Sequence, residues 1–184
     1  NHMKDQIIHV LSAADFKTFH QQNSRDFKNA PTPAITILGK VNDQLVIKLI
    51  AIDESFLPQG DEDEAAKYLE CLRTHELSEA DFVLSEPSRF YKALENIKAG
   101  RPVSPEPHLY ALDQEMKRAK ELGILSEYCA HWDEWLKEKL TEMTDEKAKE
   151  ATLERQEWRN QAAQEIQRVG RIKENYAESN FQTK

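Results

Sequence analysis

Hydrophobic residues in the first third of the chain follow the pattern of strands. Residues 34–38 and 44–52 are short runs rich in isoleucine, leucine and valine, and turn-forming residues separate them at 39–43. This arrangement predicts a β-hairpin. The second run is apolar on nearly every position, as in a central strand covered by helices. Residues 4–11 carry a further apolar run and predict a third, N-terminal strand.

After the hairpin the apolar spacing changes to three and four residues, which predicts helices. Capping residues and helix stops predict helices over about 61–75, 87–99, 105–122, 126–140 and 144–176, with a shorter one after Ser12 and another short element opening at Ser78. Gly100 and Gly123 are the expected stops of two of them.

The sequence therefore predicts an α+β fold. A small antiparallel sheet, made of the hairpin 34–52 and an N-terminal strand, packs with helices and precedes a helical portion with a long last helix. Prolines at 102, 105 and 107 form a stiff connector between these parts. We expect a small α+β domain over 4–100 and a helical region over 104–184, with one continuous domain as the alternative.

The last predicted helix has a narrow apolar stripe. Its members recur every three or four residues and include Trp158, Ile166, Val169, Ile172 and Tyr176. A stripe of this width suits a helix that lies on another surface. That surface is the rest of the chain, a second copy of it in a homodimer, or a partner protein.

Charge is distributed unevenly along the chain. The formal net charge is −8, and acidic residues concentrate between Asp53 and Glu86, including the consecutive Asp61, Glu62, Asp63 and Glu64. Acids favour helix N-termini and keep a protein in solution. The second interpretation is that this acidic band, residues 61–64, binds a partner with an electropositive surface. The overall acidity argues against a general nucleic-acid binder, and the arginines of the last helix alternate with glutamates.

Common catalytic motifs are missing from the sequence. It has no glycine-rich phosphate loop and no His or Cys spacing typical of zinc sites, so we expect no metal and no cofactor. His131 and Glu134 form the densest group of candidate ligands, without a third. Cys71 and His75 share a helical face, which is more typical of a buried thiol and a helix-end histidine than of a nucleophile and its base.

No family resemblance is evident, so function is a matter of hypothesis. The leading hypothesis is a non-enzymatic protein-binding protein, such as an inhibitor, immunity protein, chaperone or assembly adaptor. The alternative is a small hydrolase or nuclease that uses Asp53, Glu54 and His75 after the central strand. A nucleic-acid accessory role for the last helix is a third hypothesis.

The start of the chain and its cysteines bear on the cellular location. Residues 1–3 have the form of a cloning remnant that ends in an initiator Met3, and no signal-like segment follows. The two cysteines, Cys71 and Cys129, lie in apolar helical surroundings and are expected as reduced thiols. We therefore expect a cytoplasmic protein without a membrane span.

Overall fold

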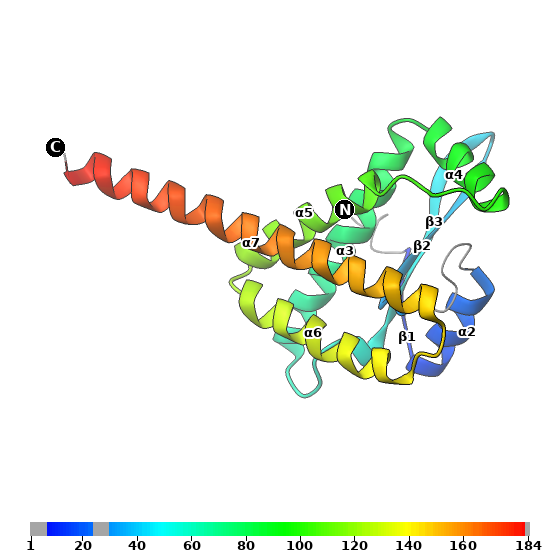
Figure 1. Ribbon diagram of the computed structural model, residues 1–184, viewed down its shortest axis with the longest axis horizontal. Coiled ribbons are helices and arrows are strands. Elements are labelled where there is room, and N and C mark those ends of the chain that lie inside the picture. The colour runs from blue at the N-terminus through cyan, green and yellow to red at the C-terminus, as the bar shows by residue number, and fades with distance from the viewer. Residues whose placement is uncertain (1–6, 24–29, 183–184) are drawn as a thin grey trace.

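The computed structural model describes the backbone of residues 7–23 and 30–182, with side chains in the last helix as far as Gly170. The chain is a mixed α+β protein that is mostly helical. Its strands lie between a short helix on one side and the longer helices on the other (Figure 1). This is the predicted fold class.

The sheet has the order β1-β3-β2, so the hairpin's second strand is central. Strands β2 (Ala34–Val41) and β3 (Gln44–Asp53) are antiparallel, and the turn at Asn42 and Asp43 has φ of 50° and 63°. Two positive φ values are the geometry of a tight hairpin turn. The N-terminal strand β1 (Ile8–Leu11) pairs with β3 in parallel. The sheet was predicted to be antiparallel, so the direction of β1, which is followed by α2 (Ala13–Asn23), is a correction. No local sequence pattern sets the direction in which an N-terminal strand pairs.

The remaining elements are helical. They are the short 3₁₀ turn η1 (Glu54–Phe56) and the helices α3 (Glu62–Leu84), α4 (Ser88–Lys98), α5 (Glu106–Glu121), α6 (Leu125–Glu142) and α7 (Glu146–Gln182). Gly100 and Gly123 end α4 and α5 with φ of 68° and 74°, as predicted for helix stops. The ribbon of α7 extends past the other helices (Figure 1).

Helix α3 is longer than the sequence pattern predicts. Ser78 lies inside it and begins no new element, because Leu77 and Ala80 are buried and continue the apolar stripe without a helix breaker. A local capping signature gives way when the packed face continues through it. The helix therefore carries its second half, including His75 and Glu79, alongside α5.

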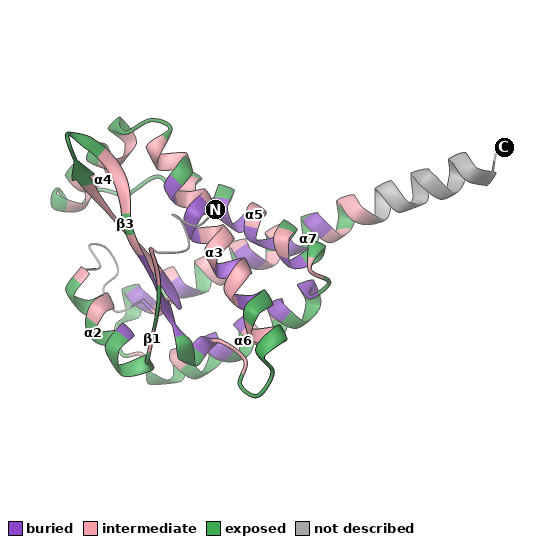
Figure 2. Cartoon of the chain, turned by 180° about the vertical axis from the view of Figure 1, so that it is seen from behind, coloured by how far each residue is buried: buried purple, intermediate pink, exposed green. Residues whose placement is uncertain are grey.

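One hydrophobic core joins the sheet to the helices on both sides of the proline connector. It contains Ile50, Phe56, Tyr68, Met116 and Tyr128. Figure 2 shows the buried residues concentrated where the C-terminal half of β3 meets the helices. Within the described part of the chain, no helix is long and apolar enough to cross a membrane.

Candidate functional site

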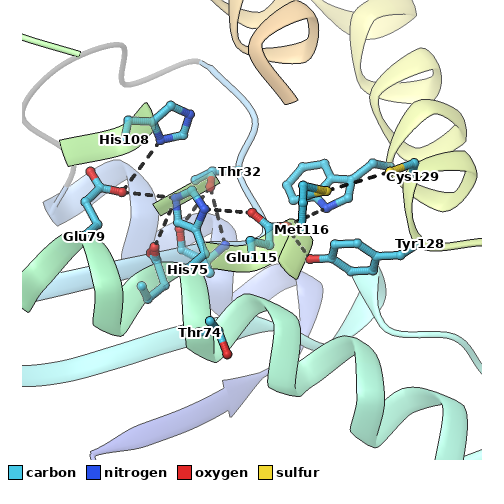
Figure 3. A network of polar contacts seen from close by, with 12 residues as sticks. Thr32, Thr74, His75, Glu79, His108, Glu115, Met116, Tyr128 and Cys129 are labelled. Atoms are coloured by element: carbon cyan, nitrogen blue, oxygen red, sulfur yellow. Dashed lines mark hydrogen bonds and ion pairs between the residues drawn. The ribbon is translucent and has the colours of Figure 1, made fainter. Parts of the chain in front are cut away.

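Three polar side chains from α3 and α5 meet beside the core, and we call them the His–Glu centre: His75, Glu79 and His108. Their candidate metal-binding atoms all lie within 4.8 Å of one another. Glu79 Oε2 is 3.1 Å from His75 Nε2 and 3.7 Å from His108 Nδ1. The side chains of His75 and His108 are 12% and 17% exposed, whereas that of Glu79 is 38% exposed. The centre is thus largely enclosed, and its carboxylate is the most exposed member. Figure 3 shows the three side chains directed toward one another.

The helices determine this geometry. His75 and Glu79 are four residues apart on α3, which places them on the same face one turn apart. His108 lies in the first turns of α5, which packs along α3. The centroids of the His108 and His75 rings are 5.0 Å apart. Trp158 of α7 lies on the other side of His108 at 6.1 Å between ring centres. Three helices therefore hold the two imidazoles in place.

Glu115 of α5 contacts the centre through His75. Its carboxylate is 1% exposed and lies 2.7 Å from His75 Nδ1. It also accepts hydrogen bonds from the Tyr128 hydroxyl at 2.5 Å and the Trp132 indole at 3.2 Å (Figure 3). The bonds from Tyr128 and Trp132 hold the Glu115 carboxylate in place. The carboxylate in turn orients the His75 ring, with Nε2 directed toward Glu79. A buried carboxylate with this many partners is strongly held.

Electrostatics within the centre are dominated by the balance between burial and opposite charge. Burial alone would lower the pKa of His75, but the hydrogen bond and charge of Glu115, with those of its neighbours Glu79 and Glu76, raise it to about 10. Burial raises the pKa of Glu76 to about 7. Burial opposes ionisation of Glu79 and Glu115 as well, but contact with the histidines keeps both pKa values below the usual range. Burial lowers the pKa of His108.

The donor set fits a divalent transition metal ion. Bonds of about 2.0–2.2 Å to nitrogen and oxygen place neighbouring ligand atoms of a tetrahedral ion roughly 3.3–3.6 Å apart. The contacts of Glu79 Oε2 with the two histidines, 3.1 Å and 3.7 Å, bracket that spacing. Glu76 Oε2 is 4.0 Å from His75 Nε2 and is the nearest additional carboxylate. Metal-bound histidines commonly donate their other N–H to a carboxylate, which is the place of Glu115 here.

A cavity of about 50 Å³ adjoins the centre. Its lining comes from segment 30–34 and from α3, α5, α6 and α7, and includes His75, His108 and Glu115. Two arginines of α7, Arg155 and Arg159, also line it. Arg159 is 6% exposed and its guanidinium carbon lies 3.6 Å from the centre of the Trp132 ring. The cavity lining therefore combines two arginines, two histidines and the carboxylates of Glu76 and Glu115.

Of the residues predicted to be functional from the sequence, His75 belongs to the centre and Trp158 lies beside it, whereas the predicted acids lie elsewhere. Asp53 is buried at the end of β3, where its Oδ1 accepts bonds from the amide and hydroxyl of Ser55 at 2.9 Å and 2.7 Å. In the acidic band, Asp61 caps α3 by accepting from the amides of Asp63 and Glu64. The band is exposed over 61–63 and half-buried at Glu64. Its role in binding a partner stays a prediction.

The stripe of the last helix is divided. Ile166 is buried within the protein, while Trp158 and Val169 are half-buried. Ile172 and Tyr176 lie outside the residues whose side chains are described. The first half of α7 thus packs on α5 and α6, and Lys120 of α5 donates to the Ile166 carbonyl at 3.4 Å.

His75 itself differs from the sequence interpretation. It is not a helix-end residue beside a thiol, because α3 continues to Leu84 and the ring bonds to carboxylates. Cys71 is a fully buried free thiol whose pKa burial raises. The sequence signal for the centre was the pair His75 and Glu79 at helical spacing. The third candidate ligand, His108, could not be placed from the sequence. It follows the proline connector, and no local sequence pattern predicts the path of that connector.

Comparison with known proteins finds no family model, no curated protein and no solved structure that matches this chain. Its function is therefore argued from the geometry of the His–Glu centre and the cavity beside it.

Proposed function

We propose that this protein binds a divalent transition metal ion, such as Zn²⁺ or Fe²⁺, through His75, Glu79 and His108. The observation that carries the proposal is the convergence of two imidazoles and one carboxylate within 4.8 Å. The second ring nitrogen of His75, Nδ1, contacts buried Glu115. Imidazole and carboxylate donors suit these ions. The competing explanation is a purely structural cluster, in which a protonated His75 is shared between Glu79 and Glu115.

Three protein donors leave coordination positions for water or a small ligand. Structural zinc sites usually have four protein ligands, whereas catalytic sites have three and an open position. An ion at this place would act as a Lewis acid toward a ligand in the adjoining cavity. The half-exposed Glu79 provides a route by which the ion enters from solvent.

The metal content of the full chain tests the proposal. The protein is stripped with a chelator, dialysed and titrated with Zn²⁺, Fe²⁺ and Mn²⁺ by calorimetry. We expect saturation near one ion per chain for the wild type. His108→Gln or Glu79→Gln should weaken binding by more than about 100-fold, because loss of an outer-shell partner alone costs about 10- to 100-fold.

The control is His9→Gln, which removes an exposed histidine of β1 and should bind as the wild type does. Saturable binding that is equal in His108→Gln and the wild type would place the ion elsewhere. No binding to the folded wild type would identify the cluster as a structural charge pair.

A second proposal is protein binding through the acidic band, with an electropositive protein as the partner and self-association through α7 as a further mode. It is supported by the exposure of Asp61, Glu62 and Asp63 at one end of α3. Exposed carboxylates speed association with basic surfaces. The free thiols of Cys71 and Cys129 support a reducing, cytoplasmic location.

The hydrolase alternative based on Asp53 and Glu54 has less support. Asp53 uses its Oδ1 to hold the turn after β3, and neither residue lines the cavity beside His75.

A further inference from the structure

The cavity beside the His–Glu centre contains a buried arginine with unused donors. Arg159 is 6% exposed, and its Nε and Nη1 have no hydrogen-bond partner among the described residues. His108 lines the same cavity, and its Nε2 is likewise buried without a partner in the described part of the chain. Leaving a buried charged donor unpaired costs more free energy than leaving a neutral one unpaired. Such groups in a native protein therefore point to a ligand that completes them.

The position of Arg159 excludes a simple internal ion pair. Glu76 and Glu115 are the two carboxylates in the cavity lining, and the oxygens of Glu115 already contact His75, Tyr128 and Trp132. No ion pair of Arg159 with a carboxylate occurs within the described residues, and the guanidinium instead stacks on Trp132. That stacking fixes the plane of the group while leaving the N–H groups free to donate.

Size and charge define what the cavity can hold. A volume of about 50 Å³ exceeds the ~10–15 Å³ needed for one water, so it admits about three waters or one group of that size. Arginine is always protonated in proteins, and both Arg155 and Arg159 line the space. The other lining hydroxyls are engaged: Thr152 donates to the Ala148 carbonyl, and Thr32 bonds to Ala34.

We propose that this cavity binds a small oxyanion, either a short carboxylate or inorganic phosphate, through the guanidinium of Arg159. The anion accepts hydrogen bonds from the free nitrogens of Arg159 and lies next to the His–Glu centre, where it completes the buried polar groups. This site goes beyond the metal proposal and does not depend on it, since both arginines are charged whether or not a metal is bound.

The test uses the full chain in its metal-free form, titrated by calorimetry with sodium phosphate and, separately, sodium formate. Sodium chloride at the same ionic strength is the reference. We expect saturable binding of one of the two oxyanions at one site per chain, and the one that binds identifies the ligand class. Arg159→Met, which keeps a long side chain over Trp132 but removes the donors, should weaken binding about 10- to 100-fold. Arg168→Met is the control, because Arg168 is on the same helix but exposed and paired with Glu165.

A second measurement covers the case in which Arg159→Met does not fold. Nitrogen-15 spectra of arginine Nε–H groups should show one resonance that shifts with the oxyanion and is missing in Arg159→Lys. Equal binding in a folded Arg159→Met, or no saturable binding and no shifting resonance in the wild type, would overturn the site and leave a cavity filled with water. Because the protein is metal-free throughout, failure here is distinct from failure of metal binding.

Discussion

The two ends of α3 differ in how they hold their acidic side chains. In the first turn Asp61, Glu62 and Asp63 are exposed, and Asp61 bonds only to backbone amides. In the second half, Glu76 is buried, and Glu79 bonds to a histidine within the same helix. The acidic residues of α3 are therefore in two different environments. Those in the first turn face solvent, and those in the second half pack beside α5.

This difference sets the energetic scale of each end. Exposed carboxylates remain solvated, so each contributes a few tenths to about 1 kcal/mol at a helix N-terminus. Enclosed carboxylates have lost water and depend on a positive partner or a proton. Removing one member of an enclosed group costs far more than removing an exposed acid.

The largest expected effect is at Glu115, the buried carboxylate that contacts His75. Glu115→Leu leaves the buried polar groups of His75, Tyr128 and Trp132 without their shared acceptor. We expect a loss of about 3–5 kcal/mol in the free energy of unfolding, measured by urea denaturation of the metal-free protein. Glu62→Leu, the same change at the exposed end, should cost less than about 1 kcal/mol. Similar losses for both variants would contradict the contrast between the two ends.

A pH dependence follows from His75, whose pKa is raised to about 10. A raised pKa means that the folded state holds the proton more tightly than the unfolded chain. The stabilisation is complete below the unfolded value near 6.5 and is lost as the pH rises toward 10. We expect the free energy of unfolding of the metal-free protein to fall by up to about 1.4 kcal/mol per pH unit above pH 7.

The useful window is pH 7.0–8.5. Glu76, with a pKa of about 7, titrates at the lower edge of this window and adds to the fall in stability there, so the comparison with His75→Gln isolates the contribution of His75. Above the window the unfolded thiols begin to ionise. His75→Gln should be less stable and should lose most of this slope. Saturating zinc should reduce the slope as well, because a bound metal requires a neutral imidazole. An unchanged slope in His75→Gln would assign the titration to another group.

How much of this could be predicted from the sequence depends on distance along the chain. The hairpin turn at Asn42 and Asp43 and the helix stops at Gly100 and Gly123 were predictable, since each depends on residues within one turn. The parallel pairing of β1 was not, because it depends on contacts with β3, some 40 residues further along the chain. Ser78 shows the opposite case, in which a local signal was overridden by continuous packing.

The candidate site follows the same rule. His75 and Glu79 have helical spacing, although the predicted helix ended at about residue 75. Their partners His108 and Glu115 lie 33 and 40 residues beyond His75. Which face α5 presents to α3 is decided by the whole core, not by any short pattern. Arg159 could not be told from its neighbours on α7, since only the fold places it over Trp132.

The smallest expected effect separates the two roles of the acidic end. Asp61→Ala removes the acceptor for the amides of Asp63 and Glu64 and should cost about 1 kcal/mol of unfolding free energy. Asp61→Asn retains a capping oxygen while removing the charge, so its stability should stay close to that of the wild type. Urea denaturation of both variants measures the cap.

The same pair of variants tests partner binding through residues 61–64. The wild type, Asp61→Asn and the triple change Asp61→Asn, Glu62→Gln, Asp63→Asn are used to capture partners from lysate at rising salt. If the band binds a basic protein, capture by the triple variant should fail at lower salt than capture by the wild type, although its fold is intact. If capture and its salt dependence are unchanged, the exposed acids of α3 serve capping and solvation alone. The partner-binding proposal would then lose its support. The metal-binding proposal would not be affected, because it depends on the enclosed acids at the other end of the helix.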